Sequence, residues 1–362
     1  MERDIGRMQW TTGAVILGAL VVGGMAYASQ ADVLPKIQSG ITKALIAKPD
    51  VVINENDPKW IKKGNYGENG RFLMDKDGNA VVTAIDTSKP IRVLDDWATA
   101  TNGENYGSIM GKSSYNTDLI TITFTNKVVL VNSGGFTMFS RSSNLKEING
   151  LDKFDTSQST DMSFMFDSLP NIKTLDLSTF DTKKVFRMVS MFANDKSLTE
   201  LNITNFNTDS LKEIDFMFLN DRSISSLDMS KFNTQNVSSM LSTFEGMTSL
   251  KSLNISNWNT SNVTQMSYLF KSNTSLKTLD VSNWNVSKVD DMRYSFSDMT
   301  SLESLDLTKW NVSNVKDMSF LFYGDKKLLS AGDLSKWGIT SEVNTNSAFW
   351  QSGVNDVPSW YK

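Results

Sequence analysis

The chain has 362 residues, with 36 Lys plus Arg against 40 Asp plus Glu, and it contains neither Cys nor His. Without imidazole or thiol groups, Ser-His-Asp and Cys-His nucleophiles, Cys/His zinc sites, disulfides and the usual haem or iron–sulfur ligands are excluded. A net charge of -4 over the whole chain gives no electrostatic basis for nucleic-acid binding. A chain of this length needs several domains or a repeat architecture, whose core lengthens without thickening.

The first 48 residues have the character of a membrane-associated segment. Residues 8–31 carry no charged side chain, and as a helix they would be roughly 36 Å long, enough to cross a bilayer core of about 30 Å. We predict a transmembrane helix here, with an amphipathic continuation from Pro35 to residue 48. Ala28 ends a small-residue sequence typical of signal-peptidase sites, so secretion of a chain that begins at Ser29 is the alternative to a retained anchor.

The same segment allows another interpretation. A hydrophobic helix that runs through Pro35 into an amphipathic one resembles the N-terminal assembly helix of type IV pilin-like proteins, with Gly6 at the end of a short leader. Thr11 stands where those proteins carry a Glu, which departs from their pattern. The resemblance implies a homo-oligomer or filament formed through this helix.

Residues 49–135 are predicted to form a small β-rich lead-in region. Residues 71–74 and 80–85 flank a turn sequence in which Gly78 can take a positive φ, which predicts a hairpin. The acidic turn lacks the Gly position and the distal Glu of an EF-hand, so a turn is favoured over a calcium site. Residues 120–124 and 128–131 predict a second pair of strands that leads into the next region.

From residue 145 onward the sequence repeats with a period of 26, and four columns recur in phase. Two are aromatic: Phe166, Phe192, Phe218, Phe244, Phe270, Phe296 and Phe322, and Phe154, Phe180, Phe206, Phe232, Trp258, Trp284 and Trp310. Two are aliphatic: Met162, Met188, Ile214, Met240, Met266, Met292 and Met318, and Ile172, Leu198, Ile224, Leu250, Leu276, Leu302 and Leu328. The register slips near residues 147–153, where the first repeat is one residue longer, and Trp337 falls one residue late in the second aromatic column.

Each repeat is predicted to hold one strand, one turn and one short helix. Residues 250–255 show the L-x-x-L-x-L pattern of a leucine-rich-repeat strand. After a turn at Trp258, apolar residues from Val263 to Phe270 recur at helical spacing. The predicted fold class is an α/β solenoid, a leucine-rich-repeat-like stack over residues 136–337 with a C-terminal cap over residues 338–362. The four columns are expected to form its core, the Trp and Met columns included.

The recurring motif F/W-[DN]-T-S-x-V-x-x-M-x-x-x-F, as in Trp258-Asn-Thr-Ser-Asn-Val-Thr-Gln-Met, resembles the BspA-like leucine-rich-repeat surface proteins of bacteria. The resemblance covers about residues 97–345. It implies an exported protein that is displayed on the cell surface and adheres to matrix, cells or protein ligands. Residues 357–362 contain neither a sortase motif nor a hydrophobic tail, so attachment is expected through the N-terminal helix.

The outward positions of the predicted strands carry small polar side chains in every repeat. The candidate ligand face comprises Asp176, Asn202, Asp228, Asn254, Asp280 and Asp306, and next to them Ser178, Thr204, Ser230, Ser256, Ser282 and Thr308. Such residues also provide solubility and hydrogen-bonding ladders on any exposed strand, which is the structural alternative. Asp280 and Asp306 are like charges on successive strands, so a bound cation is conceivable there.

The sequence therefore predicts a non-catalytic bacterial surface protein whose repeats bind an extracellular protein or glycan. It is expected to be membrane-anchored and extracellular, or secreted if cleaved after Ala28. No catalytic residue, cofactor or nucleic-acid partner is predicted. The alternative function is a pilin-like or other membrane-assembly subunit whose N-terminal helix polymerises and displays the repeats.

Overall fold

The computed structural model describes residues 53–94 and 117–361. All of these except Ile53 belong to one compact unit, Asn54–Lys362. The predicted membrane helix at residues 8–31, the cleavage site at Ala28 and the pilin-like helix lie outside the described residues. Within the described part of the chain, no helix has the length and hydrophobicity needed to span a membrane.

The unit begins with an antiparallel meander of three strands. Strand β1 (Trp60–Tyr66) pairs with β2 (Gly70–Asp75), and β2 pairs with β3 (Asn79–Ala84). The turn between β2 and β3 is held by Asp75 Oδ1, which accepts the N–H groups of Asp77 and Asn79 at 2.9 Å each. Gly78 has a φ of 79°. The predicted hairpin is therefore confirmed.

The strands that follow pair in parallel across successive coils of the chain. Strand β3 pairs with β5 (Thr121–Phe124), which pairs with β7 (Glu147–Asn149). On a second sheet, β4 (Ile91–Val93) pairs with β6 (Val128–Asn132), which pairs with β8 (Phe154–Ser159).

The prediction that residues 120–124 and 128–131 pair with each other is thus wrong, although both strands exist. The turn that joins them carries the chain around a corner. Each strand then lies in a different sheet and finds its partners in the coils before and after it.

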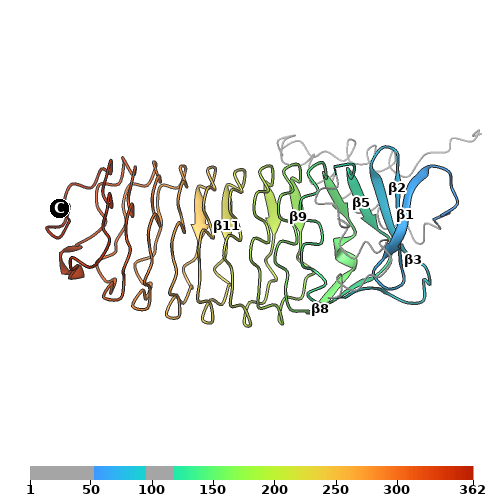
Figure 1. The fold of residues 1–362 in the computed structure, drawn as a ribbon, viewed down its shortest axis with the longest axis horizontal. Helices are drawn as coiled ribbons and strands as arrows, with labels where there is room; N and C mark the ends of the chain where they lie inside the picture. Colours follow the sequence, from blue (N-terminus) through green and yellow to red (C-terminus); the bar gives the residue numbers. More distant parts are fainter. Residues whose placement is uncertain (1–52, 95–116, 362) are drawn as a thin grey trace, which may run out of the picture. The chain divides into compact units, whose positions relative to one another are not determined.

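The repeats continue this parallel stacking (Figure 1). Strand β9 (Thr174–Asp176) pairs with β10 (Glu200–Asn202), and β11 (Ser226–Asp228) pairs with β12 (Ser252–Asn254). Beyond β12 the same column continues as single bridges, Thr278 to Ser304 and Ser304 to Ser330. The predicted L-x-x-L-x-L strands are present. A second column of parallel bridges runs from Asp161 to Asn344 on another side of each coil.

The short helix predicted in each repeat is wrong. The described residues contain two short 3-10 helices, η1 (Leu151–Lys153) and η2 (Ser335–Trp337), and no α-helix. In the repeat that contains Trp258, the N–H groups of Met266, Tyr268 and Phe270 donate to carbonyls of the next repeat at 2.8–2.9 Å. Tyr268 also has a φ of 59°.

The backbone donors that an α-helix would use internally therefore tie one repeat to the next. Leu269 N–H reaches back only to Met266 O, at 3.3 Å, as in a tight turn. Successive tight turns also bring every third or fourth side chain inward, which explains why the hydrophobic spacing looked helical. The fold is a leucine-rich-repeat-like stack of strands and turns with almost no helix.

The core follows the predicted columns, which are buried throughout. Rings of the column from Phe166 to Phe322, called here the inner Phe column, stack on one another, as in Phe192 on Phe218 at 5.5 Å and Phe244 on Phe270 at 5.6 Å. Each such pair contributes about 0.5–1.5 kcal/mol beyond its area burial. At the C-terminal end Trp360 stacks on Trp337 at 5.9 Å, so aromatic packing continues to the last described coil.

Candidate ligand-binding site

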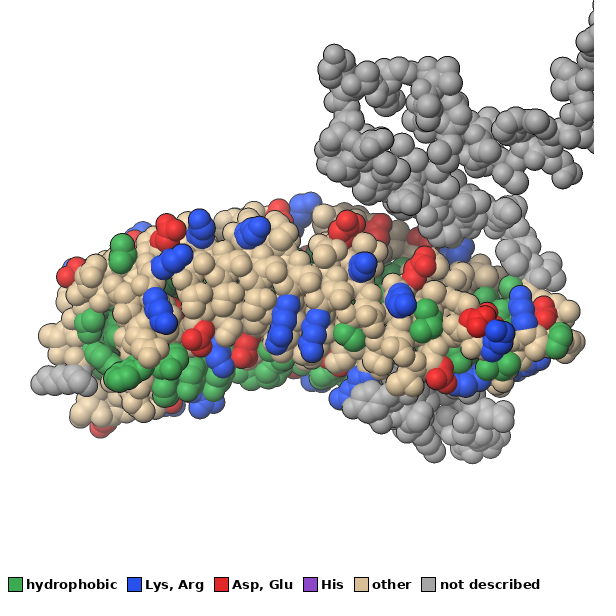
Figure 2. Space-filling view, turned by 90° about the horizontal axis from the view of Figure 1, so that it is seen from above, with side chains coloured by type: hydrophobic (Ala, Val, Ile, Leu, Met, Phe, Trp, Pro, Cys, Tyr) green, Lys and Arg blue, Asp and Glu red, His purple; other side chains and the backbone are tan. Residues whose placement is uncertain are grey.

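The two columns of the predicted ligand face lie along the strands and beside them, as expected. Every one of these twelve side chains is exposed or half-buried. The structure spreads them along the stack, one pair in each repeat, and does not gather them at one point. On the face seen in Figure 2, positive and negative side chains are interspersed over a surface of backbone and other side chains, and hydrophobic side chains gather along one edge.

Within each repeat the two columns are bonded to each other. Asp228 Oδ1 accepts the Ser230 N–H at 3.0 Å, and Asp306 Oδ1 accepts the Thr308 N–H at 3.1 Å. The Ser230 N–H lowers the pKa of the Asp228 carboxyl, and the Thr308 hydroxyl does the same for Asp306. These residues therefore build the turn after each strand, and they also fix a row of charged and amide groups in place.

The like charges of Asp280 and Asp306 on successive strands suggest a place for a bound cation. Asp280 Oδ1 accepts both the N–H and the hydroxyl of Ser282, at 3.1 and 2.8 Å. Each of the two aspartates is thus engaged with its own repeat. Among residues 53–94 and 117–361, no group of three or more acidic side chains is close enough to hold a metal ion.

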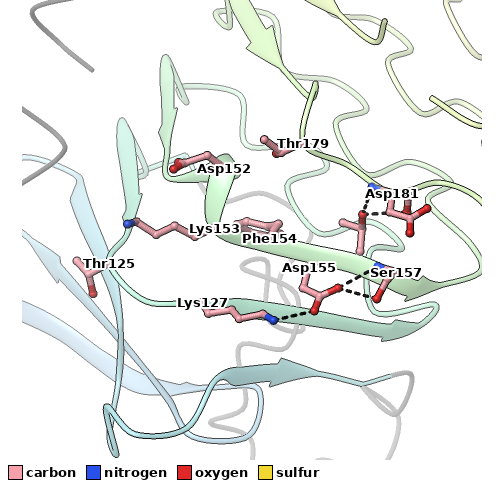
Figure 3. Close-up of a pocket in the computed structure, with 10 residues that line it drawn as sticks. Thr125, Lys127, Asp152, Lys153, Phe154, Asp155, Ser157, Thr179 and Asp181 are labelled. Atoms are coloured by element: carbon pink, nitrogen blue, oxygen red, sulfur yellow. Dashed lines mark hydrogen bonds and ion pairs between the residues drawn. The ribbon is translucent and has the colours of Figure 1, made fainter. Parts of the chain in front are cut away.

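An open pocket of about 600 Å³ lies beside the first repeat, at a place where the sequence predicts no site (Figure 3). Its walls come from the turn after β5, from η1 and the start of β8, and from the turn that follows β9. Lys153 extends from η1 toward the side of the pocket that Thr125 lines. We call this cavity the junction pocket.

The junction pocket lies where the 26-residue period is broken. The interval from the start of β7 at Glu147 to Phe154 is one residue longer than the corresponding interval from Thr174 to Phe180. The chain accommodates the extra residue with η1 and with Gly150, whose φ is 87°. A Cβ at Gly150 would lie 2.4 Å from Phe124 O, so no other residue fits there without a shift of the backbone.

The inner wall of the pocket is fixed by hydrogen bonds and one ion pair. Lys127 Nζ lies 2.8 Å from Asp155 Oδ2, and Asp155 Oδ1 accepts the Ser157 N–H and hydroxyl at 3.2 and 2.7 Å. Lys127 and then Ser157 lower the pKa of the Asp155 carboxyl. Thr156 Oγ1 donates to Asp181 O at 2.9 Å, which joins this wall to the next repeat.

Three side chains that line the pocket are not engaged in this way. The side chains of Asp152, Lys153 and Thr179 make no hydrogen bond or ion pair with any residue that the structure describes. Asp181 uses Oδ1 to accept the Lys183 N–H at 3.0 Å. The register slip at residues 147–153 was the signal in the sequence that marked this place, but it did not reveal which side chains would meet there.

The stacked parallel strands, the L-x-x-L-x-L pattern and the continuous aromatic core define a leucine-rich-repeat protein. The family described as "Mycoplasma protein of unknown function, DUF285" matches residues 136–253 and again residues 239–360. The chain belongs to this family. Because the family is associated with BspA-like leucine-rich-repeat proteins, the resemblance drawn from the 26-residue motif is confirmed.

Among solved structures, the chain is similar to several leucine-rich-repeat proteins. One from Eubacterium ventriosum is 13% identical, with a TM-score of 0.36, and the match covers 83% of this chain and 97% of that one. The leucine-rich-repeat protein TpLRR from T. pallidum is 14% identical, with a TM-score of 0.32 and coverage of 59% of this chain and 91% of that one. A leucine-rich cell surface protein from Faecalibacterium prausnitzii is 13% identical, with a TM-score of 0.26 and coverage of 79% and 98%. No curated protein matches the chain.

Proposed function

We propose that this chain is a non-catalytic bacterial cell-surface protein whose repeats bind an extracellular protein or glycan. The observation that carries the proposal is the strand face. Its outward side chains recur in every repeat, stay accessible and are held by bonds such as Asp228 to Ser230 and Asp306 to Thr308. A surface that is already ordered loses little conformational entropy when a ligand binds.

Binding would draw on many modest contacts along the stack. Because each repeat offers nearly the same polar groups, a long or repetitive ligand can engage several repeats at once, and its affinity then exceeds that of one contact. The side chains on this face accept or donate hydrogen bonds and contribute few large apolar groups. We expect the interaction to be polar and to weaken as the salt concentration rises.

Localisation is tested by protease treatment of intact producing cells, followed by N-terminal sequencing of the protein. We expect the repeats to be cleaved from intact cells while a cytoplasmic marker protein survives. An N-terminus at Met1 would indicate a retained anchor, and one at Ser29 would indicate secretion. Repeats that resist protease until the cells are lysed would contradict the proposal.

The role of the strand face is tested by charge removal that preserves the turns. We expect Asp228→Asn with Asp306→Asn to fold normally, because Asn202 and Asn254 already occupy the same column. Binding of the full chain to host cells or extracellular matrix should fall several-fold. The matched control is Asp77→Asn with Asp356→Asn, which removes two exposed charges elsewhere and should leave binding unchanged. Equal binding by both double variants would argue against the strand face.

A further inference from the structure

We propose that the junction pocket binds a neutral saccharide unit. This inference deepens the proposed function and rests on it, because it selects glycans as a ligand class and gives them a second, defined site. The junction pocket is an open hollow of about 600 Å³ on the surface, so a ligand there would stay partly exposed to solvent.

The charge of the lining argues against an anionic ligand. Two lysines and three aspartates line the pocket. Lys127 and Asp155 neutralise each other as an ion pair at 2.8 Å. Lys153, Asp152 and Asp181 remain, so one negative charge is left without a counter-charge from the lining. A carboxylated or sulfated ligand would be repelled, whereas a neutral ligand would not.

The unengaged groups fit a ligand that is rich in hydroxyls. The carboxylates of Asp152 and Asp181 can only accept hydrogen bonds, the ammonium of Lys153 can only donate them, and the hydroxyl of Thr179 does both. Each sugar hydroxyl is both a donor and an acceptor, so one saccharide unit can pair with all three kinds of group. Hydroxyl bonds to a carboxylate are charge-assisted and therefore stronger than bonds between neutral groups.

Two of the carboxylates that line the pocket, Asp155 and Asp181, are not required by the fold. Asp155 and Asp181 begin a column that continues with amides in later repeats, namely Asn207, Asn233, Asn259, Asn285 and Asn311. The turn needs one acceptor oxygen, and an amide supplies it equally well, as Asn207 does for the Asp209 N–H at 3.0 Å. The acidic side chain at Asp155 forms the ion pair with Lys127, and Asp181, which also lines the pocket, has a second oxygen, Oδ2, without a hydrogen bond to any residue that the structure describes.

The pocket is also formed before any ligand arrives. Its wall is fixed by the bonds of Asp155 and Thr156, and its shape depends on the extra residue and on Gly150. The extra residue before Phe154 is absent from the repeats that follow until the last one, where the interval from Ser330 to Trp337 is again one residue longer and is accommodated by η2 and Gly332. The lining of the junction pocket, with Lys127, Lys153 and Asp181, belongs to this part of the chain, in contrast to the strand face, which recurs in each repeat.

The test uses the full chain on a saccharide panel that contains neutral hexoses, N-acetylated hexosamines, and sialylated and sulfated oligosaccharides. Asp181→Asn is the main variant, because the later repeats show that Asn folds at this position. Lys153→Met is the second, and Asp356→Asn is the control with the same change of charge far along the stack. We expect the wild type and the control to bind neutral saccharides, and each pocket variant to bind them about tenfold more weakly, as measured by titration calorimetry.

The outcomes separate this inference from the proposed function. Neutral saccharide binding that Asp181→Asn or Lys153→Met reduces, with the control unchanged, supports the pocket. Unchanged affinity in both pocket variants, or a preference for sialylated or sulfated ligands, overturns it. If the protein binds cells through a polypeptide ligand and no saccharide, the pocket inference fails while the proposed function stands. If it binds neither, both fail.

Discussion

The N-terminal and C-terminal repeats tie neighbouring coils together with different chemistry. In the N-terminal repeats a buried threonine hydroxyl links one coil to the next: Thr234 Oγ1 donates to Asn259 O at 3.0 Å and accepts the Asn259 N–H at 2.8 Å. The threonines of this column are Thr156, Thr182, Thr208, Thr234 and Thr260. In the last repeats Val286 and Val312 replace these threonines. There an indole N–H makes the hydrogen bond between coils, since Trp310 Nε1 donates to Val281 O at 3.0 Å.

The difference shows which parts of the repeat are interchangeable. The inner Phe column is the same in both halves and is buried throughout, so it sets how closely the coils stack. The side-chain hydrogen bonds between coils differ between the two halves. The repeat that contains both Trp258 and Thr260 has both kinds. Burial of the apolar columns therefore specifies the fold, whereas the side-chain hydrogen bonds between coils only have to satisfy backbone N–H and C=O groups that stacking buries.

The largest expected effect on stability comes from the inner Phe column, which both halves share. Phe192→Ala and Phe296→Ala should each destabilise the protein by about 3–5 kcal/mol, because each removes a buried ring and leaves a cavity between two stacked neighbours. Urea unfolding followed by circular dichroism measures the loss. Tyr268→Ala, at a half-buried ring in the same region, is the control and should cost less. A loss in one half that is less than half of that in the other would break the comparison.

The second effect concerns buried aspartates, which occur in both halves. Asp325 Oδ1 accepts the Met299 N–H of the preceding repeat at 2.7 Å, and burial raises the pKa of the Asp325 carboxyl to about 8. Burial, with Asp221 beside it, likewise raises the pKa of Asp195. Since an unfolded Asp has a pKa of about 3.9, the folded protein holds protons that the unfolded chain has released. The contribution of these buried aspartates to stability should therefore be greatest in acid and be lost as the pH rises from about 4 to about 8.

Asp325→Asn isolates one of these groups. Asn273 already occupies the same column, where its Nδ2 donates to Phe270 O at 3.0 Å, so an amide is accommodated there. We expect the difference in unfolding free energy between wild type and Asp325→Asn to change by a few kcal/mol between pH 4 and pH 8, in favour of the variant at high pH. Unfolding midpoints measured across this range test the sign. A difference that does not vary with pH would show that Asp325 titrates normally.

The fold could be predicted from the sequence where burial alone decided it. The period, the four columns and the L-x-x-L-x-L strands all follow from side chains that must turn inward, and they are confirmed. The helix was wrong because spacing does not reveal which carbonyl a backbone N–H will reach. For Met266 and Phe270 that carbonyl belongs to the next repeat, so the pattern of an α-helix arose from turns. The pairing of β5 and β6 failed in the same way, because their partners lie one coil away.

The candidate site, too, could be predicted from the sequence only in part. The outward columns were placed correctly because the alternation along a strand fixes them. Their mutual bonds, such as Asp280 to Ser282, join residues two apart and could have been anticipated as local turns. The junction pocket could not, because it joins Lys127, Lys153 and Asp181 from three different coils. Only the extra residue before Phe154 marked it in the sequence.

A smaller effect tests the tie of the C-terminal half. Trp310→Phe keeps a buried aromatic ring, and Phe206 and Phe232 show that the column accepts it. It nevertheless removes the indole N–H that donates to Val281 O and leaves a partial cavity. We expect a loss of about 2 kcal/mol in the free energy of unfolding. The reciprocal change in the other half, Phe206→Trp, should fail to stabilise the protein if the extra ring has no room there. A gain in stability would show that either half accepts either tie.

The smallest effect tests the tie of the N-terminal half. Thr234→Val has the same shape but loses the hydroxyl, so the N–H and carbonyl of Asn259 lose the partner that they share. We expect a cost of about 1 kcal/mol, because Asn259 lies near the surface and water can replace part of what is lost. Thr234→Ser keeps the hydroxyl and is the matched control for the hydrogen bonds. If Ser costs more than Val, the methyl group outweighs the hydroxyl. Val, which the last repeats carry, would then be the better residue for this column, because methyl packing would contribute more to stability than the hydrogen bonds of the hydroxyl.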